Sequence, residues 1–293
     1  MKTDYRIRAT AAEGLLRAVA VSLTGAAGEA QLAHQAWPVA AAAMGRLMTT
    51  AAMVGSDMKE DVGRITVEVN GGGPLGRVVA EIRPDGSLRA RVQHPAVDLP
   101  LRADGKLPVG QAVGVDGYFR VMRQDLFGNA YQGQVELQSG EIGEDFLHYL
   151  WQSDQVASAV SVGVLVGTEG LVIGAGGVMV QALPGCPKDL VDRVAGQFEQ
   201  LTQISRRLAD GETLESLVQE VLPEPIHWYS QEPLAWRCWC DRERIQDMLK
   251  TLPDSDLLDL ISDGGAEVTC HFCRTAYHFQ TDELESFRKS AST

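Results

Sequence analysis

Apolar residues in the first part of the chain mainly follow the two-residue period of β-strands. Ile65–Val69 alternates between apolar and polar positions, a glycine-rich turn follows, and Arg77–Ile82 and Leu88–Val92 continue as further strands. The weakly polar run Val160–Leu183 is interrupted by Thr168–Gly170, which is typical of two strands around a turn. Short strands joined by tight turns predict antiparallel sheets rather than repeated strand–helix–strand units.

Two segments of this block have helical character instead. Pro38–Val54 is rich in alanine and begins with proline, a residue favoured in the first turn of a helix. Its small side chains predict very close packing against a neighbouring element. A second helix is expected to begin near Ser139–Ile142, because apolar residues then recur at helical spacing as far as Trp151.

The pattern changes at Leu183–Pro187. Beyond it, apolar residues recur every three or four positions from Leu190 to Leu208, which predicts one amphipathic helix of about five turns. Asp210-Gly211 separates this helix from a second one, which Pro223 ends. Helices this short and this charged gain much of their stability by docking on another surface.

Composition limits the possible partners. The 293 residues include 26 Lys and Arg against 39 Asp and Glu, a formal net charge of −13. This acid excess argues against nucleic acid or an anionic membrane as a partner, since both attract clustered cations. No apolar run reaches the ~20 residues of a membrane span, and no signal-peptide pattern is visible. We therefore expect a soluble, cytoplasmic protein.

Four of the five cysteines form two close pairs near the C-terminus. One residue separates Cys238 from Cys240, two separate Cys270 from Cys273, and 29 residues (241 to 269) lie between the pairs. Two thiolate pairs brought together by a folded connector supply the four sulfurs of a tetrahedral zinc site. The sequence therefore predicts one Zn²⁺ bound by all four cysteines.

The connector between the two pairs is predicted to fold. Asp241 can cap a helix, Pro253-Asp254 can begin another, and Ala266–Thr269 leads as a strand into the second pair. His271 and His278 are alternative ligands by position, but four thiolates already complete a tetrahedral site. We expect both histidines to be non-ligands, one in a solvent-facing turn and one on a half-exposed strand.

These changes of pattern divide the chain into three parts. We predict an N-terminal core over residues 1–184, a helical linker over 185–235 and a zinc-binding domain over 236–293. The predicted fold class is α+β, with an antiparallel-sheet core that carries helices, a helical linker and a small C-terminal zinc-binding domain.

The one-residue spacing of the first pair leaves two interpretations open. The zinc site is either an inert structural support or a redox switch, because oxidants attack thiolates and disulfide formation removes metal ligands. The binding energy of a structural zinc, on the order of 10 kcal/mol, is also folding energy, so its loss would unfold a domain this small.

The fifth cysteine, Cys186, stands apart at the junction between the predicted core and linker. It is either a small packing residue or a further redox-active thiol near the hinge, with its pKa lowered by the N-terminus of the following helix.

No catalytic constellation stands out in the sequence. The glycine-rich segments Gly71–Gly76 and Gly174–Gly177 lack, respectively, the Lys-Ser/Thr and the third glycine of nucleotide-binding loops. We interpret both as turns or close packing points. Ser-His-Asp and paired-carboxylate sets are not evident, and four thiolates leave zinc no position for water. We therefore expect no enzymatic activity.

Together these residues resemble the heat-shock protein 33 family of redox-regulated chaperones. Besides the two cysteine pairs, the resemblance includes Thr251–Asp254, Ser139–Ile142, Gln152–Gln155 and Val162–Val166, and it covers essentially the whole chain. Family members commonly have Glu where Asp154 stands in this sequence.

The resemblance implies an ATP-independent holdase whose reduced, zinc-bound form is inactive. It implies that oxidation releases zinc and forms the disulfides Cys238–Cys240 and Cys270–Cys273. The linker then unfolds and exposes apolar surface that binds unfolding proteins and prevents their aggregation, and the active form is a homodimer. A zinc-stabilised binding or adaptor protein with a permanent metal site remains the alternative.

Overall fold

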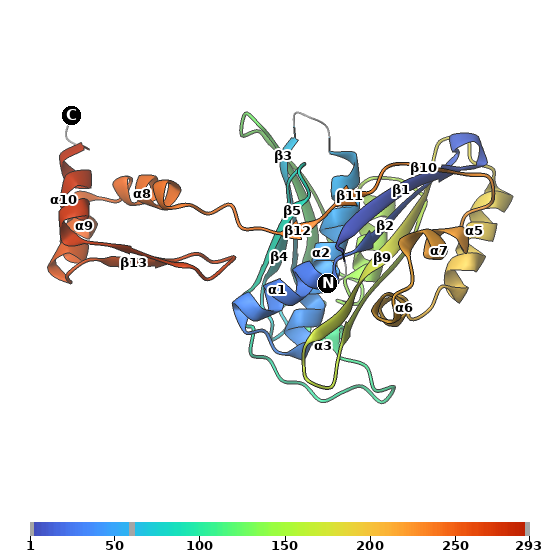
Figure 1. Cartoon of the computed structure of the whole chain (residues 1–293), viewed down its shortest axis with the longest axis horizontal. Coiled ribbons are helices and arrows are strands. Elements are labelled where there is room, and N and C mark those ends of the chain that lie inside the picture. Colours follow the sequence, from blue (N-terminus) through green and yellow to red (C-terminus); the bar gives the residue numbers. More distant parts are fainter. Residues whose placement is uncertain (1–2, 59–61, 291–293) are drawn as a thin grey trace. The chain divides into compact units, whose positions relative to one another are not determined.

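The computed structural model describes residues 3–58 and 62–290 (Figure 1). The chain forms two compact units, the first ending at Arg237 and the second beginning at Cys238. The predicted linker helices belong to the first unit. The separation of core and linker as functional parts stays a prediction.

Among the described residues, the first unit contains two six-stranded sheets. The first sheet consists of β1 (Tyr5–Ala11), β2 (Leu16–Ser22), β8 (Ser158–Val166), β9 (Val172–Ala182), β10 (Ile226–Trp228) and β11 (Glu232–Pro233). The second consists of β3 (Val62–Asn70), β4 (Val78–Ile82), β5 (Ser87–Val92), β6 (Tyr118–Asp125), β7 (Ala130–Glu136) and β12 (Ala235–Trp236).

The strand order is β10-β1-β2-β9-β8 in the first sheet, with β11 also paired to β1, and β12-β5-β4-β3-β6-β7 in the second. In the described chain every paired strand is antiparallel to its neighbour except β12, which runs parallel to β5. The predicted α+β class with antiparallel sheets is confirmed.

Helices form two further layers of this unit. Helices α1 (Thr24–His34) and α2 (Pro38–Val54) lie between the sheets, and α5 (Lys188–Gln200), α6 (Ile204–Asp210) and α7 (Leu214–Gln219) lie on the outer face of the first sheet (Figure 1). The remaining helical elements in the described part of this unit are α3 (Val109–Val113), α4 (Gly143–Gln152) and two single-turn 3₁₀ segments, Ala12–Gly14 and Gly55–Asp57.

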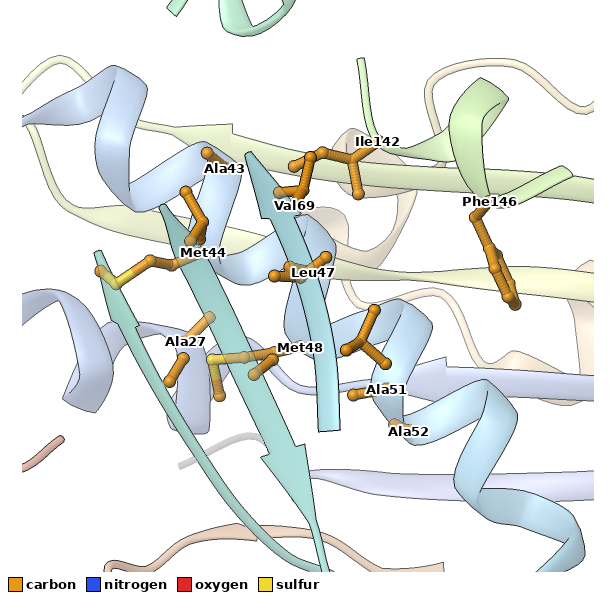
Figure 2. Close-up of a cluster of buried hydrophobic side chains, with 14 of the residues drawn as sticks. Ala27, Ala43, Met44, Leu47, Met48, Ala51, Ala52, Val69, Ile142 and Phe146 are labelled. Atoms are coloured by element: carbon orange, nitrogen blue, oxygen red, sulfur yellow. The ribbon is translucent and has the colours of Figure 1, made fainter. Parts of the chain in front are cut away.

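Helix α2 is buried on almost all sides because it runs between two sheets. Fourteen of its 17 residues, all in the described chain, are buried. Figure 2 shows Met44, Leu47 and Met48 of α2 in one apolar cluster with Ala27 of α1 and Val69 of β3. A Cβ at Gly45 would lie 2.8 Å from Cγ2 of Val164, so only glycine permits this approach of β8. The close packing predicted for this alanine-rich segment is confirmed.

The first sheet is apolar on both faces. Along β2, Leu16, Ala18 and Ala20 contact the linker side, whereas Val19 and Val21 contact the α2 side. Apolar side chains of the linker helices and of the segments around them cover the outer face and are themselves buried there: Val194, Leu201, Ile204, Leu208, Leu214, Leu217, Val218, Val221 and Leu222.

The prediction of one helix from Leu190 to Leu208 is wrong. The chain leaves helix α5 after Gln200 and re-enters a helix at Ile204, with Gln203 in a left-handed conformation (φ 53°). The break lets α6 lie directly on β9, where a Cβ at Gly174 would meet the Ser205 carbonyl oxygen at 2.1 Å. The interpretation of this glycine segment as a close packing point is confirmed.

The second unit contains α8 (Arg242–Lys250), α9 (Asp254–Ser262), the hairpin β13 (Ala266–Thr269) and β14 (Ala276–Phe279), and α10 (Thr281–Ser290). Asp241 caps α8 as predicted, since its Oδ1 accepts a hydrogen bond from Arg244 N at 2.8 Å. Among the described residues of this unit, the buried apolar side chains are Ile245, Leu249, Leu257, Phe279, Leu284 and Phe287. A core this small contributes little stability by itself.

The carboxylate of Asp145 organises the loop that precedes α4. It is fully buried and accepts hydrogen bonds from the backbone N–H groups of Gln138, Ser139, Gly140 and Ile142 at 2.7 to 3.3 Å. This arrangement explains why the segment Ser139–Ile142 forms a fixed turn.

We predict that Asp145→Asn lowers the free energy of unfolding of the first unit by about 2 kcal/mol, because an amide NH₂ replaces one acceptor and leaves a buried N–H unpaired. Urea denaturation measures this loss. Asp125→Asn is the matched control, since Asp125 also accepts backbone N–H bonds but is only partly buried. Equal losses in the two variants would contradict the role of Asp145.

Candidate metal centre

The structure brings the four C-terminal cysteines together. Their sulfur atoms all lie within 4.8 Å of one another, and all four residues are partly buried. Sγ of Cys238 lies 3.7 Å from Sγ of Cys270, and Sγ of Cys240 lies 3.3 Å from Sγ of Cys273. Each short distance therefore joins one member of the first pair to one member of the second.

The hairpin β13–β14 positions the second pair. Cys270 N donates to the Thr275 carbonyl oxygen and Arg274 N donates to the Cys270 carbonyl oxygen, both at 2.9 Å. Arg274 adopts a left-handed conformation (φ 60°), which closes this turn. The first pair lies on the segment before α8. Helices α8 and α9 and strand β13 then bring the chain back, so that the second pair lies beside the first.

This donor set fits a tetrahedral metal ion. Metal–sulfur bonds of ~2.3 Å separate the sulfurs of a tetrahedron by about 3.8 Å, close to the arrangement present. Four sulfur donors favour a soft or borderline cation. The described cluster contains neither His271 nor His278. Nδ1 of His278 lies 3.4 Å from Oε2 of Glu267 instead.

The sulfurs differ in how readily they ionise. Burial raises the pKa of Cys240, and the neighbouring cysteines add to this effect, while the Tyr277 hydroxyl opposes it. Burial also disfavours the Cys273 thiolate, but hydrogen bonds from Thr275 and contacts with the other sulfurs lower the pKa of Cys273 to about 7. Thiolates this close repel one another, and a divalent cation would stabilise all four.

Two hydroxyl groups beside the sulfurs were not predicted from the sequence. Oη of Tyr277 lies 3.2 Å from Sγ of Cys240, and Oγ1 of Thr275 lies 3.2 Å from Sγ of Cys273. The hydrogen bond to Cys240 and burial raise the pKa of Tyr277. The two-residue alternation of an extended segment after Cys273 is the signal that points to these residues.

Cys186 lies just before α5, in the first unit. It packs at the edge of the linker cluster, the apolar cluster that the linker helices form with the outer face of the first sheet. Burial raises the pKa of Cys186, and the nearby Asp189 raises it further. The hypothesis of a thiol activated by a lowered pKa is therefore wrong in direction.

Comparison with known proteins identifies the family. The family model described as Hsp33 protein matches residues 4–280. The chain belongs to the heat-shock protein 33 family. The 33 kDa chaperonin of Bacillus velezensis is 40% identical over 287 residues, which cover 97% of this chain and 98% of that protein. The 33 kDa chaperonin of Bacillus subtilis is 38% identical over 286 residues, with 97% and 98% coverage.

A solved structure agrees with this assignment. The crystal structure of the 33 kDa chaperonin (heat shock protein 33 homolog) of Thermotoga maritima matches with a TM-score of 0.90 and 30% identity, and the match covers 99% of each chain. The family resemblance and the fold class expected from the sequence are thus confirmed, and this chain is a member of a chaperone family. Within its described residues, no helix is both long enough and apolar enough to cross a membrane.

We predict that Cys238→Ser lowers the affinity for Zn²⁺ by about 100-fold or more, since one of four ligands accounts for roughly a quarter of the ~10–16 kcal/mol of a structural zinc site. A competition titration against a chromogenic chelator measures the affinity, and circular dichroism reports loosening of the second unit. Cys186→Ser is the control and leaves both unchanged. Unchanged zinc affinity in Cys238→Ser would exclude this sulfur as a ligand.

Proposed function

We propose that this protein is an ATP-independent holdase that thiol oxidation activates. The observation that carries the proposal is the gathering of four sulfurs within 4.8 Å in a unit whose own apolar core is small. Zinc bound there would hold both cysteine pairs as thiolates and join the start of the unit to its β13–β14 hairpin. The unit would then depend on a support that oxidants can remove.

The proposed chemistry converts each sulfur pair into a disulfide. Two thiolates, one hydrogen peroxide and two protons give one disulfide and two waters, so the sulfurs lose the two electrons that the peroxide gains. We propose the pairs Cys238–Cys240 and Cys270–Cys273. This pairing rests on the family resemblance, because the shortest sulfur–sulfur distances run between the pairs.

The linker helices are the proposed cover of the client-binding surface. They bury the outer face of the first sheet, including Ile7 and Leu16. Release of these helices would expose apolar side chains on the sheet and on the helices themselves, which suits the binding of unfolding polypeptides. We propose that the oxidised, active form is a homodimer.

Polar contacts attach the linker to β1. Nε of Arg6, a side chain almost fully buried, donates to Oε2 of Glu232 at 2.6 Å, and its Nη1 donates to the Ala52 carbonyl oxygen at 3.0 Å. Oη of Tyr5 donates to Oε2 of Glu215 at 3.1 Å. These contacts hold both ends of the segment from Glu215 to Glu232 in the reduced structure.

The last residues before the cysteines are also held. Ala235 and Trp236 pair with Ser87 and Leu88, and Arg237 N donates to the Leu88 carbonyl oxygen at 2.8 Å. The short strand β12, which pairs with β5, thus connects the linker directly to Cys238. Loss of order after Cys238 can pass into the linker once this pairing opens.

Peroxide treatment separates this proposal from a permanently zinc-stabilised adaptor. Reduced, zinc-loaded protein is treated with peroxide at mild heat, and zinc release is measured beside light scattering of a heat-unfolding client without ATP. We expect suppression of aggregation only after zinc release. Retained zinc, or equal suppression by the reduced form, would contradict the proposal, and Cys186→Ser is expected to behave as the unmodified protein does.

We predict that Leu217→Ala gives partial activity without oxidation. Leu217 is fully buried in the linker cluster, and a cavity at such a site costs about 2–5 kcal/mol, which here weakens linker docking. Suppression by the reduced variant and hydrogen exchange of the linker are measured together. Leu126→Ala, at a residue 68% exposed, is the control. Fast linker exchange without suppression would show that the linker does not cover the client-binding surface.

A further inference from the structure

One sulfur of each cysteine pair has a hydroxyl group at hydrogen-bond distance. Tyr277 faces Cys240 and Thr275 faces Cys273, each at 3.2 Å. The two residues are separated by one position in an extended segment, so both side chains point to the same side. The hydroxyls therefore reach the cluster from a single edge of the hairpin.

The position of the Tyr277 hydroxyl is fixed by its surroundings. Tyr277 pairs with Val268 in the β13–β14 hairpin, and its ring packs against the small core of the second unit. A phenol ring anchored in this way has little freedom to turn its hydroxyl elsewhere. The hydrogen bond is thus part of the fold of the unit and not a contact of a mobile surface side chain.

We propose that Tyr277 is a positioning residue of the redox switch, whose hydroxyl donates a hydrogen bond to the Cys240 sulfur, strengthens metal binding and slows oxidation of that sulfur. Thr275, whose Oγ1 lies 3.2 Å from Sγ of Cys273, has the same role once that sulfur is a thiolate and only the hydroxyl carries a proton to donate. This inference rests on the proposed function for its redox part, whereas its metal-binding part stands on the geometry of the cluster.

The physical basis is the electron density on sulfur. A thiolate attacks one oxygen of hydrogen peroxide, an S–O bond forms as the O–O bond breaks, and hydroxide leaves; a second thiolate then displaces another hydroxide from the sulfenic acid to form the disulfide. A hydrogen bond donated to sulfur withdraws density from the attacking atom. Groups that bond to metal ligands also orient them, and removal of such groups typically costs 10–100-fold in metal affinity.

The alternative is a purely structural role, in which the Tyr277 ring only fills space in the small core of the second unit. Tyr277→Phe separates the two, because the ring remains and only the hydroxyl is removed. If packing is the sole role, the variant keeps its zinc affinity and its rate of zinc release. If the hydrogen bond matters, both change while the fold is retained.

The experiment uses the full chain, reduced and loaded with Zn²⁺. A competition titration with a chromogenic chelator gives zinc affinity under anaerobic conditions, and stopped-flow absorbance gives zinc release after peroxide. Differential alkylation with mass spectrometry follows the Cys240 thiol. For Tyr277→Phe we expect affinity about 10-fold weaker, several-fold faster zinc release and earlier loss of the Cys240 thiol. Tyr229→Phe, in the first unit, is the matched control.

Affinity and release rates within twofold of the unmodified protein, with unchanged circular dichroism, would overturn the proposal. Thr275→Val tests it independently at Cys273 and decides the matter if Tyr277→Phe does not fold. The affinity measurement does not depend on the switch. If the unmodified protein keeps its zinc under peroxide, the proposed function fails while the role of Tyr277 in metal binding is still tested.

Discussion

Strand β2 places Val19 and Val21 against α2 on one face and Leu16, Ala18 and Ala20 against the linker helices on the other. A sheet that is apolar on both faces must be covered on both, because exposed apolar area is costly in water. The inner face is covered permanently by α2, which is enclosed between two sheets. The outer face is covered by three short helices, and everything proposed about activation depends on that second cover being removable.

The two units differ in what holds them together. The first has two extensive apolar clusters and hydrogen-bonded sheets, so it needs neither metal nor disulfide to remain folded. The second has six buried apolar side chains among its described residues and a sulfur cluster. Under the proposed function, chemistry at the sulfurs would act first on the weaker unit, and the sheets and α2 of the larger unit would stay folded when its linker helices are released.

Much of this organisation follows from residue patterns. Pro38–Val54 is a helix with the predicted bounds, and Ala266–Thr269 is the predicted strand. The cysteine spacing also anticipates the gathering of four sulfurs. Strand β2 has no alternation to detect because both of its faces are apolar. The break before Ile204 depends on the glycines of β9, far away in sequence, and Tyr277 belongs to no metal-ligand motif, so tertiary contacts alone reveal them.

The glycines of β9 limit which mutations the fold can tolerate. A side chain at Gly174 would overlap the backbone of α6 at Ser205, and one at Gly176 would come within 2.6 Å of Cδ1 of Leu208. Both positions are far in sequence from the four clustered cysteines. A side chain at Gly174 would displace α6 from the sheet, whereas one at Gly176 would first meet the Val21 carbonyl oxygen of β2 at 2.2 Å. Under the proposed function, a mutation at Gly174 would loosen the cover of the client-binding surface while the four clustered cysteines stayed intact, so selection would act on this codon as well as on the cysteine codons.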